Sequence, residues 1–179
     1  MSKVERVHTR NKGIFFIIRK IVESAYLLKG VSSGEIINGI LDESVEIRHI
    51  PVGEKIVKES EPDLNEFFIL LGGKVQITRL GHPIFEVLPT AIVGDVEFVD
   101  SDPNNVTTVT AIEPTVIISF SREFVDGLCP ESQRNIYKNL ACELGKKFSI
   151  VNNVVVQKDV KLGILSEEEL SLLKQHSST

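Results

Sequence analysis

The chain has 179 residues, 42% of them apolar, and a formal net charge of -5 at pH 7. One compact domain with a substantial buried core is expected at this length. Residues 13–18 form an apolar stretch near the N-terminus, which is far shorter than the ~20 residues that a membrane-spanning helix needs. No small-residue cleavage site follows it, so the sequence argues against a transmembrane span and a signal peptide, and we expect a cytoplasmic location.

Positive charge is concentrated in residues 1–26, which we interpret as a basic N-terminal arm and helix. Residues 1–20 hold six Lys and Arg residues but a single Glu, so the remainder of the chain is more acidic than its net charge suggests. A basic arm can contact nucleic acid or anionic lipid, but such a terminus is more commonly just solvated. Nucleic-acid affinity depends mainly on attraction to phosphates, and the acidic body therefore argues against nucleic-acid binding.

Two short helices are predicted before the first strand. Residues 14–28 show helical spacing of apolar positions, and Gly30 ends this helix. Its buried face is expected to include Phe15, Ile18, Val22 and Tyr26. Ser32 and Glu35 have the spacing of a capping box, in which two side chains satisfy free amides at a helix N-terminus, so a second helix is expected through Leu41.

From Val45 onward the apolar pattern has a period of two, which is typical of β-strands with one buried face. Short strands separated by Gly and Pro turns favour an antiparallel sandwich or roll over a parallel sheet. The predicted fold class is therefore mainly β with flanking helices, an antiparallel β-roll that is double-stranded and jelly-roll-like. Strands are expected over residues 45–50, 55–57, 67–71, 75–78, 84–88, 106–111 and 115–120.

Residues 92–111 interrupt this strand pattern and form the candidate ligand site. A short apolar run ends at Gly94, an acidic segment follows, and a strand pattern resumes at Val106 after a Pro-Asn-Asn turn. We interpret the stretch as a loop with one short helical turn, held between two strands. The acidic residues are Asp95, Glu97, Asp100 and Asp102, and no Lys or Arg occurs between Arg79 and Arg122.

Helices are predicted again after the last strand. Ser121 has the chemistry of an N-cap for a short helix, and Pro130 opens a much longer one. Along residues 131–155 apolar positions recur in a heptad-like seam, which favours helix pairing, although one face of an ordinary amphipathic helix gives the same pattern. The seam consists of Tyr137, Leu140, Leu144, Phe148, Val151 and Val155. Ser166 begins a second capping box, which predicts a helix and tail in residues 158–179.

The order of these elements resembles the cyclic nucleotide-binding domain family, which occurs in catabolite activator-type regulators and kinase regulatory subunits. The resemblance covers about residues 27–155, with the roll assigned to residues 27–129 and a dimerisation-type helix to residues 130–157. Its signatures are Pro51-Val52-Gly53-Glu54, Gly73-Lys74-Val75, Leu88-Pro89 and Gly94-Asp95. In this family the long helix pairs two subunits, so the resemblance implies a homodimer. Few residues follow Val155, and no helix-turn-helix, DNA-binding domain is expected.

The resemblance also implies a phosphate-binding cassette, in which Gly94 and the following amides hold the phosphate and Asp95 takes the ribose hydroxyl. The family's phosphate-binding arginine is missing. Its position is Asn104 when counted from Gly94 and Asn105 when counted back from the threonines that follow. Losing such a partner typically costs ~2–5 kcal/mol, which weakens a micromolar ligand to about 0.1 mM or worse. The candidate pocket of this degenerate cassette comprises Gly94, Asp95, Val96, Asn104, Asn105, Val106 and Thr107.

Other positions offer little further chemistry. Thr90 replaces a glycine that usually precedes the cassette in this family. Cys129 and Cys142 lack the spacing of a zinc motif and are expected to be reduced thiols. His8, His49, His82 and His176 stand singly, without a metal-binding cluster, and His49 is expected to be a structural histidine rather than a base. We therefore expect no metal, no cofactor and no enzyme activity.

Two functional hypotheses follow from the sequence. The first is a non-catalytic regulatory or adaptor module that does not bind cyclic AMP or cyclic GMP and acts through an unidentified protein partner. The alternative is a small-ligand sensor that holds a cyclic nucleotide or another anionic ligand in the roll.

Overall fold

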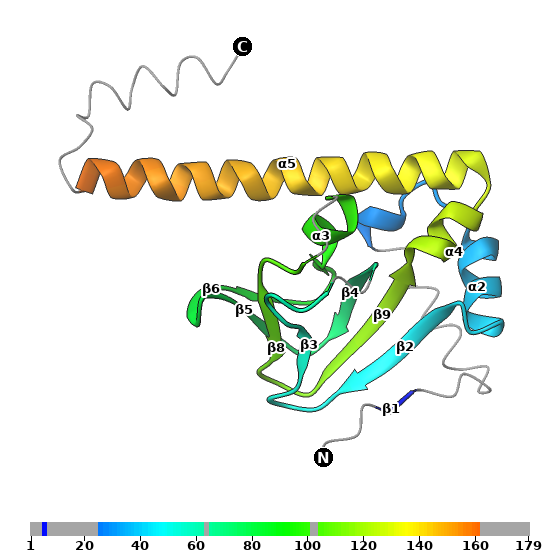
Figure 1. Cartoon of the computed structure of the whole chain (residues 1–179). Coiled ribbons are helices and arrows are strands. Elements are labelled where there is room, and N and C mark those ends of the chain that lie inside the picture. Colours follow the sequence, from blue (N-terminus) through cyan, green and yellow to red (C-terminus); the bar gives the residue numbers. More distant parts are fainter. Residues whose placement is uncertain (1–4, 7–24, 63–64, 101–103, 162–179) are drawn as a thin grey trace, which may run out of the picture. The chain divides into compact units, whose positions relative to one another are not determined.

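The computed structural model describes residues 5–6, 25–62, 65–100 and 104–161, with side chains described between residues 25 and 155 of these ranges. The chain forms two compact units, residues 1–140 and 141–179. The described strands and the first turns of the long helix belong to the first unit (Figure 1). Most of the basic arm, most of the predicted helix over 14–28, and the terminal helix after Ser166 lie outside the described residues.

Two antiparallel sheets form the predicted β-roll (Figure 1). One sheet has the strand order β1-β2-β9-β4-β7 and the other has the order β3-β8-β5-β6. The expected strands are present, although β8 begins two residues later than Val106. The strands are β1 (Glu5–Arg6), β2 (Val45–Ile50), β3 (Lys55–Val57), β4 (Glu66–Gly72), β5 (Val75–Arg79), β6 (His82–Val87), β7 (Ile92–Val93), β8 (Thr108–Ala111) and β9 (Thr115–Ser121).

Strand β4 is buried on both faces because two apolar clusters pack against it. Phe67 and Ile69 belong to the cluster that includes the helices, whereas Phe68 and Leu70 belong to the cluster between the two sheets. Side chains alternate along a strand, so this unbroken apolar run is divided between two cores. Phe67 stacks on Phe120 of β9, with ring centroids 5.2 Å apart. A one-residue slip of β4 would exchange the two cores, and its register is therefore strongly determined.

The same two-sided burial explains the position of His49. Val45 and Ile47 of β2 are buried in the cluster with the helices, whereas Ile50 is buried between the sheets. His49 follows Val45 and Ile47 on their face of the strand, but it lies at the end of β2, where that cluster no longer covers it. Its side chain is exposed, and the prediction of a structural histidine is therefore wrong.

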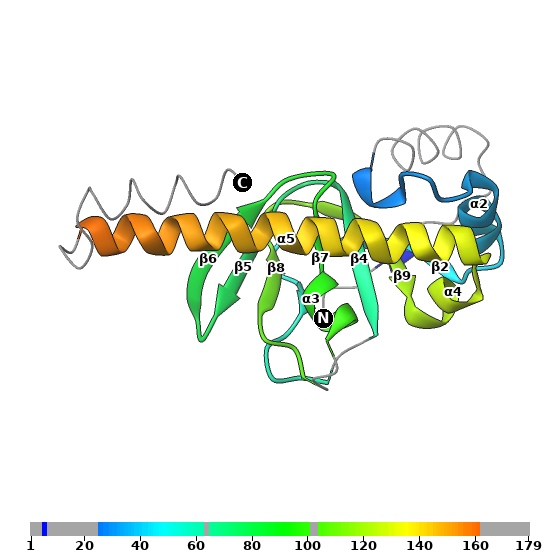
Figure 2. The same ribbon diagram turned by 90° about the horizontal axis from the view of Figure 1, so that it is seen from above.

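Helices cover one side of the first sheet. They are the 3-10 helix η1 (Tyr26–Leu28), the α-helices α2 (Ser33–Leu41) and α4 (Arg122–Gly127), and residues 130–140 of α5 (Pro130–Lys161), which is an uninterrupted helix (Figure 2). Ser121 caps α4 as predicted, accepting a hydrogen bond from the Phe124 amide at 3.1 Å. Tyr26 was predicted to be buried, but it is 43% exposed. The chain forms a tight 3-10 turn here, which buries Leu27 and Leu28 instead.

Glu35 of α2 caps a different helix from the one predicted. Its Oε1 accepts a hydrogen bond from the backbone N–H of Cys129 at 2.7 Å, and its Oε2 accepts one from the hydroxyl of Ser132 at 2.5 Å. These donors lie at the start of α5, so Glu35 fastens α2 to α5. The side chain of Ser32 makes no capping bond, and its backbone N–H donates to Ser132 Oγ at 3.1 Å. The capping box therefore located the start of α2 correctly, but its side-chain pairing is wrong.

Thr90 lies just before β7 with a φ of +73°, in the left-handed region that favours glycine. Its backbone N–H donates to the carbonyl oxygen of Leu70 at 2.8 Å, which fixes the chain in this conformation. A β-branched side chain in the left-handed region is strained, at a cost of roughly 1–3 kcal/mol.

We expect Glu35→Gln to lower the free energy of unfolding by about 1 kcal/mol at neutral pH, because a carboxylate is a stronger acceptor than a neutral amide. Burial raises the pKa of Glu35, but the hydrogen bonds from the Cys129 amide and the Ser132 hydroxyl outweigh it and hold the pKa below its ordinary value. The extra stability is therefore present above the unfolded-state pKa and is lost as pH falls through the folded-state pKa.

Urea unfolding at neutral pH and below about pH 3 measures this effect, and the two proteins should converge in acid. Glu123→Gln, at an exposed position of α4, is the matched control and should change stability little. A deficit of Glu35→Gln that stays constant down to acid pH would contradict the charge-assisted cap.

We expect Thr90→Gly to raise the free energy of unfolding by about 1 kcal/mol, because relief of strain exceeds the added entropy of the unfolded chain. Thr107, whose φ is not positive, gives the control: Thr107→Gly should destabilise the protein. Chemical denaturation of both variants measures the difference. Equal destabilisation by the two substitutions would show that Thr90 is unstrained.

Candidate functional site

The cassette stretch has the predicted form, a short helix held between two strands. Strand β7 ends at Val93 and is followed by Gly94, which has a φ of +78° and precedes helix α3 (Asp95–Val99). A Cβ on Gly94 would lie 3.0 Å from the carbonyl oxygen of Glu66, so this position favours glycine for both space and conformation. Phe98 anchors the helix, since it is fully buried and packs edge-on against Phe67 with ring centroids 4.9 Å apart.

Two carboxylates of α3 are buried. Asp95 is 2% exposed and Glu97 is 5% exposed. Glu97 Oε1 accepts a hydrogen bond from the backbone N–H of Val106 at 3.3 Å. Val106 lies between the cassette loop and β8, which begins at Thr108. The Glu97 carboxyl group therefore joins helix α3 to the segment that leads into β8.

The two candidate arginine positions differ in their surroundings. Asn105 is 5% exposed, its Nδ2 donates to the carbonyl oxygen of Pro62 at 3.3 Å, and its backbone bonds to Ser60 and Glu61. It therefore joins the cassette to the segment after β3. Asn104 is exposed and forms a β-bridge with Pro62. Among the other predicted pocket residues, Val96 is exposed, while Gly94, Val106 and Thr107 are half-buried.

A cation does contact α3, but at its C-terminal end. The guanidinium of Arg122 donates through Nη2 to the carbonyl oxygen of Phe98 and lies 4.6 Å from the centre of the Phe98 ring. Its Nε donates to Asn65 Oδ1 at 3.2 Å. These contacts place the positive charge of Arg122 at the C-terminal end of α3, which carries partial negative charge, and Gly94 lies at the opposite end of this short helix. Sequence reasoning missed this contact because Arg122 follows the next two strands of the chain.

Phe98 also connects the cassette to the base of α5. Its ring lies 6.4 Å from that of Tyr137, and the Tyr137 hydroxyl donates to Asp126 Oδ1 of α4 at 3.1 Å. Burial raises the pKa of Tyr137, and the hydrogen bond and negative charge of Asp126 raise it further. A displacement of α3 would therefore be felt directly by α4 and by the first turns of α5.

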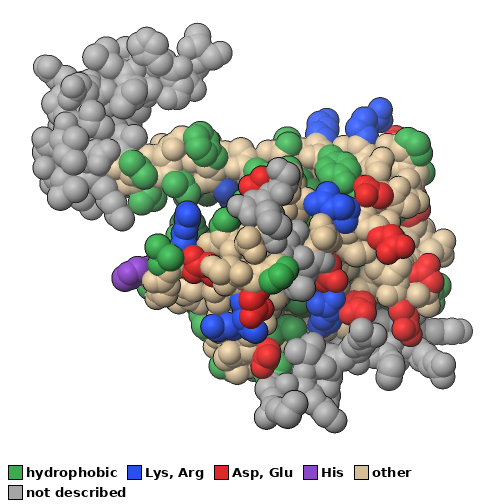
Figure 3. All heavy atoms as spheres, in the orientation of Figure 1, with side chains coloured by type: hydrophobic (Ala, Val, Ile, Leu, Met, Phe, Trp, Pro, Cys, Tyr) green, Lys and Arg blue, Asp and Glu red, His purple; other side chains and the backbone are tan. Residues whose placement is uncertain are grey.

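The predicted seam of α5 is divided between two environments. Leu140 is fully buried in the core of the first unit, and Tyr137 packs against the same core, so neither offers a free surface. In the second unit Leu144 is half-buried, while Phe148 is 67% exposed and Val151 and Val155 are also exposed. Figure 3 shows apolar side chains along this part of the helix. Among the predicted seam residues, the exposed or half-buried side chains are therefore those between residues 144 and 155.

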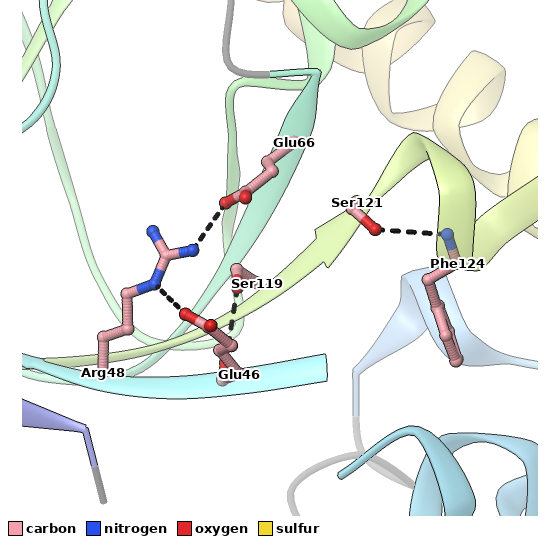
Figure 4. Close-up of polar contacts among 6 residues, drawn as sticks. All are labelled: Glu46, Arg48, Glu66, Ser119, Ser121 and Phe124. Atoms are coloured by element: carbon pink, nitrogen blue, oxygen red, sulfur yellow. Dashed lines mark hydrogen bonds and ion pairs between the residues drawn. The ribbon is translucent and has the colours of Figure 1, made fainter. Parts of the chain in front are cut away.

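A cavity of about 590 Å³ lies beside α2 and α4, away from the predicted cassette residues. Figure 4 shows two of its lining residues, Glu46 and Glu66, which pair with Arg48 behind the lining at 2.9 Å and 2.8 Å. The described residues that line the cavity include no Lys or Arg and carry six carboxylates, from Glu35, Asp42, Glu43, Glu46, Glu66 and Glu123. Among the described residues, this lining is therefore mainly acidic, although Arg48 offsets the charge of Glu46 and Glu66.

Within the residues that the structure describes, no helix combines the length and apolarity needed to cross a membrane. The same residues contain no group of three His, Cys, Asp or Glu side chains placed to hold a metal ion.

Comparisons with known proteins agree with this geometry. Residues 47–132 match the family model described as the cyclic nucleotide-binding domain, and no curated protein matches the sequence. A cyclic nucleotide-binding domain from Methylobacillus flagellatus KT is similar, with 19% identity over 87% of this chain and 89% of that one, at a TM-score of 0.69. Thermus thermophilus catabolite activator protein is also similar, with 19% identity over 75% of this chain and 63% of that one, at a TM-score of 0.61.

A further similar structure is the regulatory subunit of a cAMP-independent protein kinase A from Trypanosoma cruzi, bound to guanosine. It shares 15% identity with this chain over 72% of this chain and 44% of that one, at a TM-score of 0.57. This chain therefore spans less than two thirds of the kinase subunit and of the catabolite activator. At these identities the likeness establishes the fold, and the family model identifies the domain. Residues 47–132 therefore match the cyclic nucleotide-binding domain family, and the β-roll of this chain has the fold of that domain.

Proposed function

We propose that this protein is a non-catalytic regulatory or adaptor module that does not bind cyclic AMP or cyclic GMP and acts through protein contacts in the cytoplasm. The observation that carries the proposal is the buried carboxylate of Glu97 on the Val106 amide. The resemblance assigns the phosphate to Gly94 and the amides that follow it, and Glu97 adds a buried carboxylate to this same helix.

The charges around the cassette also argue against the binding of a cyclic nucleotide. No Lys or Arg occurs in the sequence between Arg79 and Arg122, and the guanidinium of Arg122 is engaged at Phe98. A phosphate charge about 5 Å from one carboxylate is repelled by roughly 3 kcal/mol at an effective dielectric constant of about 20. Asp95 and Glu97 are both buried, so solvent screens them weakly.

The contacts of α3 support a regulatory role rather than catalysis. Phe98, Tyr137 and Asp126 link the cassette to α4 and α5, so an event at one element is transmitted to the others by direct packing. The exposed apolar side chains of α5 would then form the output surface, through which two copies pair: Phe148, Ile150, Val151, Val154 and Val155. We propose a homodimer, with a further protein partner recognising the paired module.

A second candidate function is a receptor for an uncharged ligand that carries hydroxyl groups. Carboxylates such as those of Asp95 and Glu97 repel phosphates, but they can accept hydrogen bonds from the hydroxyl groups of an uncharged ligand. The similar kinase regulatory subunit from Trypanosoma cruzi, described as cAMP-independent, is bound to guanosine, which has a ribose but no phosphate. A nucleoside therefore belongs in any ligand screen of this protein.

We expect no binding of cyclic AMP or cyclic GMP at micromolar concentrations, because the cassette lacks a cation and contains buried carboxylates. Titration calorimetry on nucleotide-stripped protein measures this directly. A thermal-shift screen that includes guanosine tests the second candidate, since a ligand at 100 times its dissociation constant adds ~2.7 kcal/mol to the stability of the native state. A dissociation constant below about 10 μM for either cyclic nucleotide would contradict the proposal, because it corresponds to more than ~6.8 kcal/mol of binding free energy.

We expect the double substitution of Leu144 and Phe148 by Glu to give a folded monomer, because charges on the seam cannot be buried against a second helix. Multi-angle light scattering at tens of micromolar measures the mass. Substitution of Lys146 and Asn153 by Glu, on the opposite side of the same helix, is the matched control and should leave the dimer intact. An unmodified protein that is already monomeric under these conditions would contradict the dimer.

A further inference from the structure

We propose that Glu97 determines the ligand selectivity of this cassette by occupying the position of an anion with its own carboxylate. The inference rests on the proposed function, because it explains how a cassette of this family excludes phosphates. It goes beyond the missing arginine, which only removes an attraction. Glu97 supplies both a steric block and a charge of the wrong sign.

The backbone N–H of Val106 already has an acceptor within the chain. Val106 precedes β8, so its N–H is available to a group other than a neighbouring strand. Its acceptor is Glu97 Oε1, at 3.3 Å. A phosphate oxygen that accepted the same N–H would have to occupy the space of that carboxylate oxygen. While Glu97 is in place, its carboxylate and an external anion therefore compete for the Val106 N–H, which cannot bond to both.

The side chain of Glu97 is also buried and held in place by the packing of α3. Glu97 is 5% exposed, so its carboxylate lies inside the cassette rather than on the surface. It extends from the same helix as Phe98, whose buried ring fixes α3 against β4. The carboxylate is thus held on Val106 by the packing of the helix that carries it. Its hydrogen bond is slightly longer than the usual N–H···O range, so selection depends on occupancy and charge more than on the strength of this bond.

The ligand class follows from the donor that Glu97 covers. A backbone N–H without a neighbouring cation binds small oxyanions weakly and distinguishes little between them. The matching probe is inorganic phosphate, which carries the chemistry of a nucleotide phosphate without a base or ribose. Removal of Glu97 should therefore create a weak phosphate site at Val106.

The experiment compares Glu97→Ala, Glu97→Ser and Glu97→Gln with the unmodified protein by amide nuclear magnetic resonance during a titration with inorganic phosphate. Ala and Ser are too short to reach Val106, so the Val106 resonance should shift with phosphate in both variants. Gln keeps an acceptor on the amide, so Glu97→Gln and the unmodified protein should not respond. Glu123→Ala removes an exposed carboxylate from α4 and controls for net charge.

A second readout restores the missing cation. Asn104 is the exposed arginine position, so Asn104→Arg is combined with Glu97→Ala and titrated with cyclic AMP. The double variant should bind at least about tenfold more tightly than Asn104→Arg alone, a difference of ~1.4 kcal/mol. Equal affinities, a silent Val106 resonance in both short variants, or a response of Glu97→Gln equal to that of Glu97→Ala would each overturn the role of Glu97. Binding of cyclic AMP by the unmodified protein would instead overturn the proposed function, so the two failures are distinguishable.

Discussion

The burial of Phe98 is the interaction on which the rest of this structure depends. Its ring fills the space between Phe67 of β4, the guanidinium of Arg122 and the ring of Tyr137. It thereby joins three elements that are separate in the sequence: the cassette helix, the start of α4 and the base of α5. Since interiors are closely packed, none of these can move far without the others. A roll that connects its ligand loop to a long helix in this way is suited to transmitting a binding event or a protein contact.

Burial also imposes a constraint on the chemistry of the cassette. A buried carboxylate needs a hydrogen-bond partner, because an unpaired charge in an apolar interior is strongly disfavoured. Glu97 finds its partner in the Val106 amide, within the cassette itself. The negative charge that a nucleotide would bring is thus already present in the chain. Under the proposed function, the asparagines at the arginine position and the buried carboxylate would both act against phosphate binding.

Much of the fold could be predicted from the sequence, because strand alternation and turn glycines act over short distances. The run from Phe67 to Leu70 showed a buried strand, and Ser121 showed a helix start. The site was less accessible, because its decisive contacts join residues far apart in the chain. Glu35 has the local spacing of a capping box, yet its carboxylate bonds to the Cys129 amide across 94 residues. The negative charge of Glu97 was visible in the sequence, but its position on Val106 depends on how α3 packs.

An experimental structure of the unmodified protein, crystallised with saturating cyclic AMP, tests the central claim most directly. The account predicts that the Glu97 carboxylate remains on the Val106 amide and that no nucleotide lies between α3 and β8. A cyclic nucleotide whose phosphate accepts the Val106 N–H, with Glu97 displaced, would contradict it.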